Sequence, residues 1–289
     1  MSPISKTTNL LSIDAIPALP PRPVEGHKGL FGRVLVVGGN EDMIGAPVFA
    51  GTAALRLGSG LVQIAVPRSN LAICLSITPE LVGLGLGKPA AETELWKAAE
   101  KADAIVLGPG LGQSRAARDR LRRLVRMDKP MVVDADGLNL IAAEKKWPAY
   151  FKARAVLTPH PGEMERLAKL IGRSEVPTDE AGRIHLATQA ASAFGQIIVL
   201  KGHRTIVTDG RRVYVNTTGD STLSKAGTGD VLSGMIGCLL GQKMEPFDAA
   251  ILGVHLHGVA GEIAGKRWGR RCALARDVIE MISQAVRRS

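Results

Sequence analysis

The sequence predicts an α/β protein with a doubly wound, mostly parallel sheet flanked by helices on both faces. Short and nearly continuous apolar runs recur along the chain, as expected for strands that are buried on both faces of a parallel sheet. Longer amphipathic segments separate these runs, which is the strand–helix alternation of such folds. Hydrophobic residues make up 45% of the chain and aromatic residues only 3%, so the core is built mainly from aliphatic side chains.

The elements follow in a regular order after an N-terminal segment rich in proline. Residues 1–25 contain Pro17, Pro20, Pro21 and Pro23 and are expected to form an extended arm, whereas residues 26–289 are expected to form a single domain. Strands are predicted at 34–37, 61–66, 104–107, 131–133, 155–157 and 197–200. Helices are predicted between them at 46–57, 92–101, 114–127, 138–145, 163–171 and 178–194. A hairpin at 205–208 and 213–216 precedes three closing helices at 229–240, 247–266 and 275–287.

The charge pattern argues against nucleic acid or a membrane as a partner. The formal net charge is +10, but the densest basic run, 115–126, alternates its six arginines with an apolar stripe and is predicted to be one wet helix face. Aromatic residues do not interleave with these arginines, which disfavours base stacking. The excess charge is instead expected to help attract a polyanionic small molecule.

Hydropathy and cysteine usage suggest a cytoplasmic protein. No run reaches the ~18 apolar residues of a membrane span, and the first residues lack the pattern of a signal peptide. The three cysteines are too few and too scattered for a disulfide framework or a zinc site.

Polar and glycine-rich loops follow five of the predicted strands. Since the carboxyl ends of parallel strands meet at one edge of a sheet, these loops are expected to build a ligand site together. They are residues 38–40, 108–112, 134–137, 158–163 and 201–205.

A sixth stretch, Gly227-Thr228-Gly229-Asp230, opens an apolar helical pattern. The start of a helix offers free backbone N–H groups and the positive end of its dipole, and glycine lets an anion approach them. Asp230 would repel a phosphate, so it is better suited to accept a proton from an attacking hydroxyl. The alternative is a first-turn acid placed by the helix dipole, and the motif alone leaves both readings open.

The side chains in the strand-end loops have competing interpretations. Asp134 and Asp136 are candidates for a metal or water cluster, although a helix cap is favoured for Asp136. His160 lies between two prolines and is expected to contact a ligand. Glu163 is either an acid that the helix dipole favours at the start of a helix, or a residue that holds Mg²⁺ through water.

The remaining candidates follow the last of these strands and the closing helices. Residues 201–205 (Lys-Gly-His-Arg-Thr) suit the phosphate and ribose of a nucleotide, or form a polar hairpin connection. His185, His255 and His257 lie inside helical patterns and are expected to be structural.

Taken together, these stretches resemble the ribokinase-like superfamily and, within it, the ADP/ATP-dependent NAD(P)H-hydrate dehydratases. Thr-Pro-His-Pro-Gly-Glu at 158–163 combined with Ala-Gly-Thr-Gly-Asp at 226–230 is the most specific part of the resemblance. His-Lys-Gly at 27–29, Gly-Ala at 45–46, Gly-Pro-Gly-Leu-Gly at 108–112, Asp-Ala-Asp-Gly-Leu at 134–138 and Lys-Gly at 201–202 occur in the family's order.

The resemblance implies that ADP or ATP phosphorylates the C6 hydroxyl of the S-epimer of NADH or NADPH hydrate. Loss of phosphate then restores the dihydronicotinamide, and Mg²⁺ is expected to accompany the nucleotide, with its ligands unassigned. By resemblance, the catalytic residues are Asp230, Gly227 and Gly229. The residues that bind the nucleotide are Lys201, Gly202, His203, Arg204, Thr205 and Gly229. The residues that bind the hydrate are Ala46, Gly110, His160 and Asp230.

The resemblance also carries expectations about assembly, and the sequence departs from the family in two places. A homotetramer is implied by resemblance only. The family's usual Asn-x-Thr-Gly-Asn is Asn-Thr-Thr-Gly-Asp at 216–220, so Asp220 replaces an amide and affects the details of nucleotide binding. Many relatives carry an N-terminal epimerase domain, for which the segment before His27 is too short, so a separate epimerase is expected.

Two other functions remain alternatives at this point. The first is a small-molecule kinase of the same superfamily that acts on a vitamin-precursor alcohol and also uses Asp230. The second is a nucleotide-binding regulatory module without turnover, which Asp230→Ala would distinguish from an enzyme.

Overall fold

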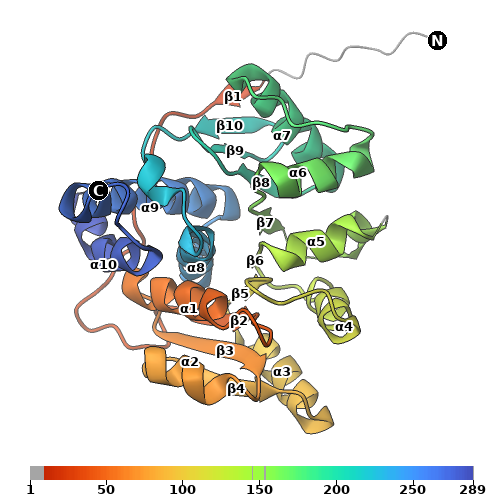
Figure 1. Ribbon diagram of the computed structural model, residues 1–289, viewed down its shortest axis with the longest axis vertical. Coiled ribbons are helices and arrows are strands. Elements are labelled where there is room, and N and C mark those ends of the chain that lie inside the picture. Colours follow the sequence, from red (N-terminus) through yellow and green to blue (C-terminus); the bar gives the residue numbers. More distant parts are fainter. Residues whose placement is uncertain (1–9, 145, 153, 289) are drawn as a thin grey trace.

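The computed structural model describes residues 10–144, 146–152 and 154–288, and its strands form one ten-stranded sheet. The order is β1-β10-β9-β8-β7-β6-β5-β2-β3-β4, running from top to bottom in Figure 1. The strands are β1 (Leu11–Ser12), β2 (Arg33–Val37), β3 (Leu61–Pro67), β4 (Val82–Leu86), β5 (Ala104–Leu107), β6 (Met131–Val133), β7 (Ala155–Leu157), β8 (Ile197–Leu200), β9 (Ile206–Thr208) and β10 (Arg212–Val215). Strand β9 is antiparallel to both of its neighbours, and the other pairs are parallel.

Helices cover both faces of the sheet, which confirms the predicted doubly wound α/β class (Figure 1). One face packs against α1 (Gly45–Leu57), α2 (Leu71–Ile77), α8 (Thr228–Gly241), α9 (Pro246–Trp268) and α10 (Ala275–Val286). The other packs against α3 (Pro89–Lys101), α4 (Arg115–Leu124), α5 (Asp136–Ala142), α6 (Pro161–Ala168) and α7 (Glu180–Phe194). The 3₁₀ turns are η1 (Trp147–Tyr150), η2 (Lys169–Ile171) and η3 (Ser221–Leu223). Among the described residues, no helix is both long and apolar enough to cross a bilayer.

The two hydrophobic cores follow directly from the alternation of side chains along each strand. In β2, Val34 and Val36 face the core under α8, whereas Leu35 and Val37 face the core under α3 and α4. All four side chains are almost completely buried. The six predicted strands are therefore apolar on both faces because each face is covered by helices.

The sequence analysis missed one strand–helix unit at the edge of the sheet. Strand β4 pairs in parallel with β3, and α2 precedes it. Gly83 and Gly85 interrupt the apolar pattern of β4, and both are needed for packing. A Cβ on Gly83 would lie 2.4 Å from Cδ1 of Leu71, and one on Gly85 would lie 2.4 Å from Cδ of Arg68.

The N-terminal arm is attached to the opposite edge of the sheet. Leu11 and Ser12 pair in parallel with Arg212 and Val213 of β10, so the described part of the expected arm contributes a short strand. Ile16 packs further along against the core under α8 and α9. Residues 1–9 of the predicted arm lie outside the described residues, as does Lys145 at the end of the predicted helix 138–145.

Candidate active site

The start of α8 has the geometry of an anion-binding site. Gly227 is its N-cap, with φ of 90°, and a Cβ there would lie 2.8 Å from Cε2 of Phe49. Both observations require glycine at this position. The hydroxyl of Thr228 donates to the carbonyls of Leu223 (2.7 Å) and Lys225 (2.8 Å), which closes the loop in front of the helix. The N–H of Thr228 donates to the carbonyl of Lys225 (3.4 Å), so the N–H groups that the helix start offers to a ligand are those of Gly229 and Asp230.

Asp230 lies in the first turn of α8, where its carboxyl group has an unusual environment. Burial raises its pKa to about 7, the negative charges of Asp134 and Glu163 contribute in the same direction, and the positive charge of Lys201 opposes them. A carboxyl group with a pKa near 7 can both take up and release a proton at neutral pH. This is the property required of a general base.

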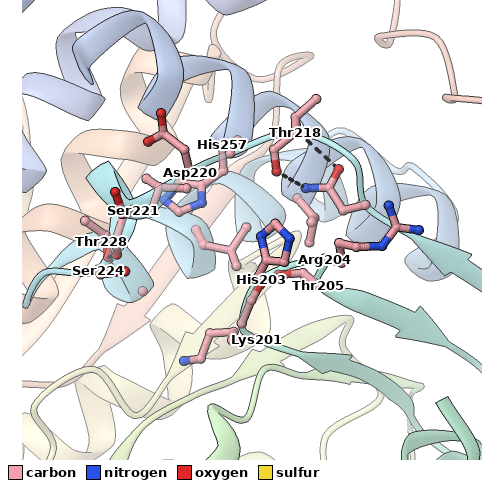
Figure 2. Close-up of a pocket in the computed structure, with 18 residues that line it drawn as sticks. Lys201, His203, Arg204, Thr205, Thr218, Asp220, Ser221, Ser224, Thr228 and His257 are labelled. Carbon is pink, nitrogen blue, oxygen red and sulfur yellow. Dashed lines mark hydrogen bonds between the residues drawn. The ribbon is translucent and has the colours of Figure 1, made fainter. Parts of the chain in front are cut away.

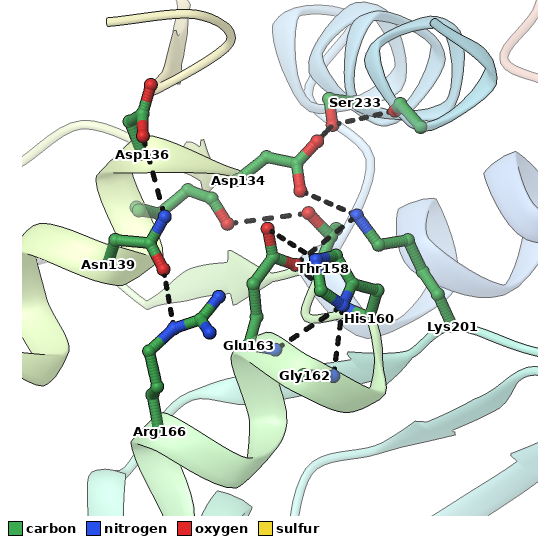
Figure 3. A network of polar contacts seen from close by, with 12 residues as sticks. Asp134, Asp136, Asn139, Thr158, His160, Gly162, Glu163, Arg166, Lys201 and Ser233 are labelled. Atoms are coloured by element: carbon green, nitrogen blue, oxygen red, sulfur yellow. Dashed lines mark hydrogen bonds and ion pairs between the residues drawn. The ribbon is translucent and has the colours of Figure 1, made fainter. Parts of the chain in front are cut away.

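The charges that act on Asp230 belong to a buried ionic network from neighbouring strand ends, which Figure 3 shows beside α8. Asp134 follows β6, is 1% exposed, and contacts Lys201 Nζ at 2.8 Å through Oδ1. Its other oxygen accepts a hydrogen bond from the Ser233 hydroxyl on α8. Burial lowers the pKa of Lys201, but the charges of Asp134 and Glu163 outweigh it and the net shift is upward. Lys201 is therefore held as a cation beside Asp230.

His160 and Glu163 form a reciprocal cap at the start of α6. His160 Nδ1 accepts from the backbone N–H of Gly162 (3.0 Å) and of Glu163 (3.4 Å), while Glu163 accepts from the backbone N–H of His160 at 2.8 Å. The second partner of Glu163 is Lys201, at 3.7 Å. Burial raises the pKa of Glu163 despite this cation. His160 thus has a structural role in the cap, and its contact with the hydrate stays a prediction.

The structure does not support the expected cap by Asp136. The N-cap of α5 is Ala135, with φ of 50°, and Asp136 lies in the first turn. Its carboxylate accepts from the backbone N–H of Gly112 at 2.8 Å, and so fixes the glycine-rich loop after β5. The prediction was wrong because it considered only the local helix, whereas the neighbouring strand-end loop supplies the partner.

The donor set near Asp230 gives little support for a metal held by protein alone. No group of three or more His, Cys, Asp or Glu side chains within the described part of the chain is arranged to hold a metal ion. Both oxygens of Asp134 are already bonded to Lys201 and Ser233. These residues fit Mg²⁺ as an ion that would be bound mainly by phosphates and water.

A pocket of about 320 Å³ opens beside the start of α8 (Figure 2). It is lined by all the residues that resemblance assigned to the nucleotide, namely Lys201, Gly202, His203, Arg204, Thr205 and Gly229. Leu223, Leu232 and Val254 give it an apolar portion. The pocket thus combines a cationic and amide-rich end with an apolar end, as an adenine nucleotide requires.

Two of the residues predicted to bind the hydrate, Ala46 and Gly110, lie against each other. A Cβ on Gly110 would lie 3.2 Å from Cβ of Ala46, so the loop after β5 touches the first turn of α1. The same helix supplies Phe49, which contacts Gly227. The start of α1 therefore connects Ala46 and Gly110 to the anion site, and the assignment of both to the substrate remains a prediction.

Among the pocket-lining residues that the sequence analysis did not assign to the nucleotide are the polar side chains of His257 and Asn216. His257 lines the pocket, so its interpretation as purely structural is incomplete. Asn216 is 3% exposed and accepts from the hydroxyls of Tyr214 (3.0 Å) and Thr218 (3.1 Å), which fixes the loop after β10. Asp220 also lines the pocket and contacts Thr222 N at 2.8 Å and Arg270 Nε at 2.7 Å. Its carboxylate is therefore neutralised in this structure.

Comparison with known proteins gives the same architecture and a specific family. Fold and site define a ribokinase-like α/β protein with a nucleotide-sized pocket at its strand ends. A crystal structure named as the ADP/ATP-dependent NAD(P)H-hydrate dehydratase of Bacillus subtilis, co-crystallised with ATP/Mg²⁺, matches with a TM-score of 0.80 and 30% identity over 94% of both chains. The sequence model of the NAD(P)H-hydrate dehydratase family matches residues 34–284, and the chain belongs to that family.

Two relatives illustrate how much of each protein is shared. A bifunctional NAD(P)H-hydrate repair enzyme, Nnr, of Moorella thermoacetica is 40% identical over 280 residues, which cover 93% of this chain and 52% of that protein. An ADP-dependent (S)-NAD(P)H-hydrate dehydratase of Neisseria meningitidis is 38% identical over 248 residues, which cover 84% and 80%. The chain spans about half the length of the bifunctional relatives it matches.

Proposed function

We propose that this protein uses ADP or ATP to dehydrate the S-epimer of NADH or NADPH hydrate and so restores the reduced cofactor. The observation that carries the proposal is the position of Asp230. Its carboxyl group lies in the first turn of α8, directly after Gly229, which lines the nucleotide-sized pocket, and burial raises its pKa to about 7. Family membership and the names of the relatives support this choice of substrate.

In the first step, Asp230 accepts the proton of the C6 hydroxyl while the hydroxyl oxygen attacks the terminal phosphorus of the nucleotide. The bond from phosphorus to the nucleotide breaks, leaving AMP from ADP or ADP from ATP. The backbone N–H groups that follow Gly227 stabilise the charge on the transferred phosphoryl group. Lys201 supplies a positive charge at the same place. Mg²⁺ would be held mainly by the phosphates and water and would neutralise further charge, and Glu163 is the residue proposed to hold it through water.

In the second step, the C6–O bond breaks and its electron pair leaves with phosphate. The lone pair of the ring nitrogen compensates for this loss, and departure of a proton from carbon 5 restores the C5–C6 double bond. Phosphorylation is needed because hydroxide is a poor leaving group. The residues around Ala46 and Gly110 would hold the nicotinamide ring in place during both steps.

The test combines hydrated NADH, Mg²⁺ and either nucleotide with the purified protein and follows the return of the dihydronicotinamide absorbance. We expect a rise that depends on the nucleotide and falls by about 10²- to 10⁴-fold in Asp230→Ala. Asp128→Ala, at an exposed position after α4, is the matched control and should leave the rate unchanged. A stable phosphorylated product without restored absorbance would indicate a kinase instead, and nucleotide binding without any turnover would indicate a regulatory module.

The setting of this activity is also proposed. The composition and cysteine usage favour the cytoplasm, and the bifunctional relatives support a functional link to an NAD(P)H-hydrate epimerase. Addition of an epimerase should extend the reaction from the S-epimer to a mixture of both epimers. A homotetramer is the expected assembly, and light scattering during size-exclusion chromatography would measure it.

A further inference from the structure

The nucleotide pocket contains a buried histidine whose hydrogen bonding is incomplete. His257 lies on α9 with Val254 and Gly258, and these three residues line the pocket from one helix face. The side chain is 7% exposed, and its Nε2 atom has no hydrogen-bond partner. Figure 2 shows the His257 ring among the side chains of the pocket. A buried polar atom without a partner is costly, so a ligand that supplies one would gain from this position.

The surroundings of His257 determine which kind of partner it needs. Burial lowers its pKa to about 4, with a contribution from the charge of Lys201, so the ring is neutral at physiological pH. A hydrogen bond to the backbone of Thr228 raises the pKa, which is the effect of a bond that the ring donates to a carbonyl. Since Nε2 has no partner, we assign this proton to Nδ1. Nε2 then carries a lone pair and requires a donor.

Because Nε2 of His257 requires a hydrogen-bond donor, most polar atoms of a nucleotide cannot be its partner. Phosphate oxygens only accept hydrogen bonds, so the phosphates cannot satisfy Nε2. The apolar portion of the pocket, which includes Val254 one turn before His257, suits the base. An adenine nucleoside offers donors at its exocyclic amine and at its ribose hydroxyls.

We propose that His257 determines nucleotide specificity by accepting a hydrogen bond, through Nε2, from the nucleoside of the bound adenine nucleotide. The proposal rests on the proposed use of ADP or ATP. It adds a contact outside the residues that the family resemblance assigns to the nucleotide. The donor is either the exocyclic amine or a ribose hydroxyl, and the experiment distinguishes the two.

The test measures binding by calorimetry in the absence of hydrate, using ADP, inosine diphosphate, 2′-deoxy-ADP and 3′-deoxy-ADP. Wild-type protein should bind the analogue that lacks the paired donor about three- to tenfold more weakly than ADP. His257→Phe, which removes the acceptor, should weaken ADP by a similar factor and bind that analogue as well as ADP. His257→Gln retains an acceptor and should recover most of the ADP affinity.

The matched control is His255→Phe, because His255 is on the same helix, also has a buried nitrogen without a partner, and does not line the pocket. It should bind all four nucleotides as the wild type does. If none of the analogues binds the wild type more weakly than ADP, the proposal is wrong, even if His257→Phe fails to fold. The proposal is also wrong if an analogue that binds the wild type more weakly than ADP shows the same difference from ADP in His257→Phe. Normal ADP binding without restored absorbance would contradict only the proposed function, whereas absence of binding of both ADP and ATP would overturn both proposals.

Discussion

Asp230→Asn should stabilise the protein above neutral pH while it abolishes activity. In the folded protein the Asp230 carboxyl has a pKa of about 7, compared with 3.8 for an ordinary aspartate. Between these two pH values the folded state binds more protons than the unfolded state, so the contribution of Asp230 to stability falls as the pH rises. Above pH 7 the carboxylate is fully charged in its buried position. Asparagine has a similar shape and does not carry this charge.

The shift of about three pKa units corresponds to at most about 4 kcal/mol, because one unit is worth about 1.4 kcal/mol. For a chain of this length, that free energy raises the melting temperature by up to about 6 °C. The gain should be greatest near pH 8 and absent near pH 4, where the wild-type carboxyl is protonated in the folded state.

The measurement is thermal unfolding of the wild type and Asp230→Asn at intervals from pH 4 to pH 9. Asp128→Asn, which removes an exposed carboxylate, is the control and should change the melting temperature little at any pH. A variant that is less stable than the wild type at pH 8 would refute the reasoning. It would mean that favourable contacts of the Asp230 carboxylate outweigh the cost of its burial.

Three further predictions concern the surrounding network. Lys201→Met leaves the buried Asp134 carboxylate without its cation and should lower the free energy of unfolding in urea by about 3–5 kcal/mol. Adding Asp134→Asn should restore much of this loss. A double variant whose loss equals the sum of the two single losses would contradict this expectation. Gly227→Ala is expected to cost about 1–3 kcal/mol because of its φ of 90°, whereas Gly229→Ala, without this constraint, should cost less, as denaturant melts would show. Asp220→Asn breaks the ion pair with Arg270, whose side chain is 70% exposed, so the free energy of unfolding should change by less than about 1 kcal/mol. The Kd for ADP should change by less than about twofold. A larger change of this Kd in calorimetry would mean that the replacement of the family's usual Asn by Asp220 has a functional role.

The central strands and the edge of the sheet that carries the site could be predicted from the sequence because their signals are local. Strand β6, for example, is a short apolar run because it is buried on both faces of the sheet. Asp134 follows it directly because the carboxyl ends of the strands form the edge of the sheet at which the site lies. Strand β4 was missed because Gly83 and Gly85 remove the side chains on which a periodicity depends. The reason for these glycines is their close contact with other segments, which the sequence does not display.

The same limit applies to the site. His255 and His257 lie two residues apart in one helix and were both expected to be structural, yet of the two only His257 lines the nucleotide pocket. Asp136 has the sequence position of a helix cap, but its partner is Gly112, 24 residues earlier in the chain. The role of a residue such as Asp136 depends on a neighbouring strand-end loop, and that of His257 depends on which face of its helix points to the pocket. Such roles can be identified only in the folded structure.

The proposed mechanism requires an acid to act beside an anion-binding helix start, and the surroundings of Asp230 offer a physical reason why this is feasible. An ordinary aspartate would be fully charged at neutral pH and would repel the phosphoryl group that it must serve. Burial and the charge of Asp134 raise the pKa of Asp230, so the carboxylate is a stronger base and gains most when it takes up the substrate proton. The pairing of Asp134 with Lys201 keeps a cation in the same place for the phosphoryl group. Under the proposed mechanism, a proton acceptor and an anion site can therefore share the first turn of α8, because protonation of Asp230 would remove the repulsion as the phosphoryl group is transferred.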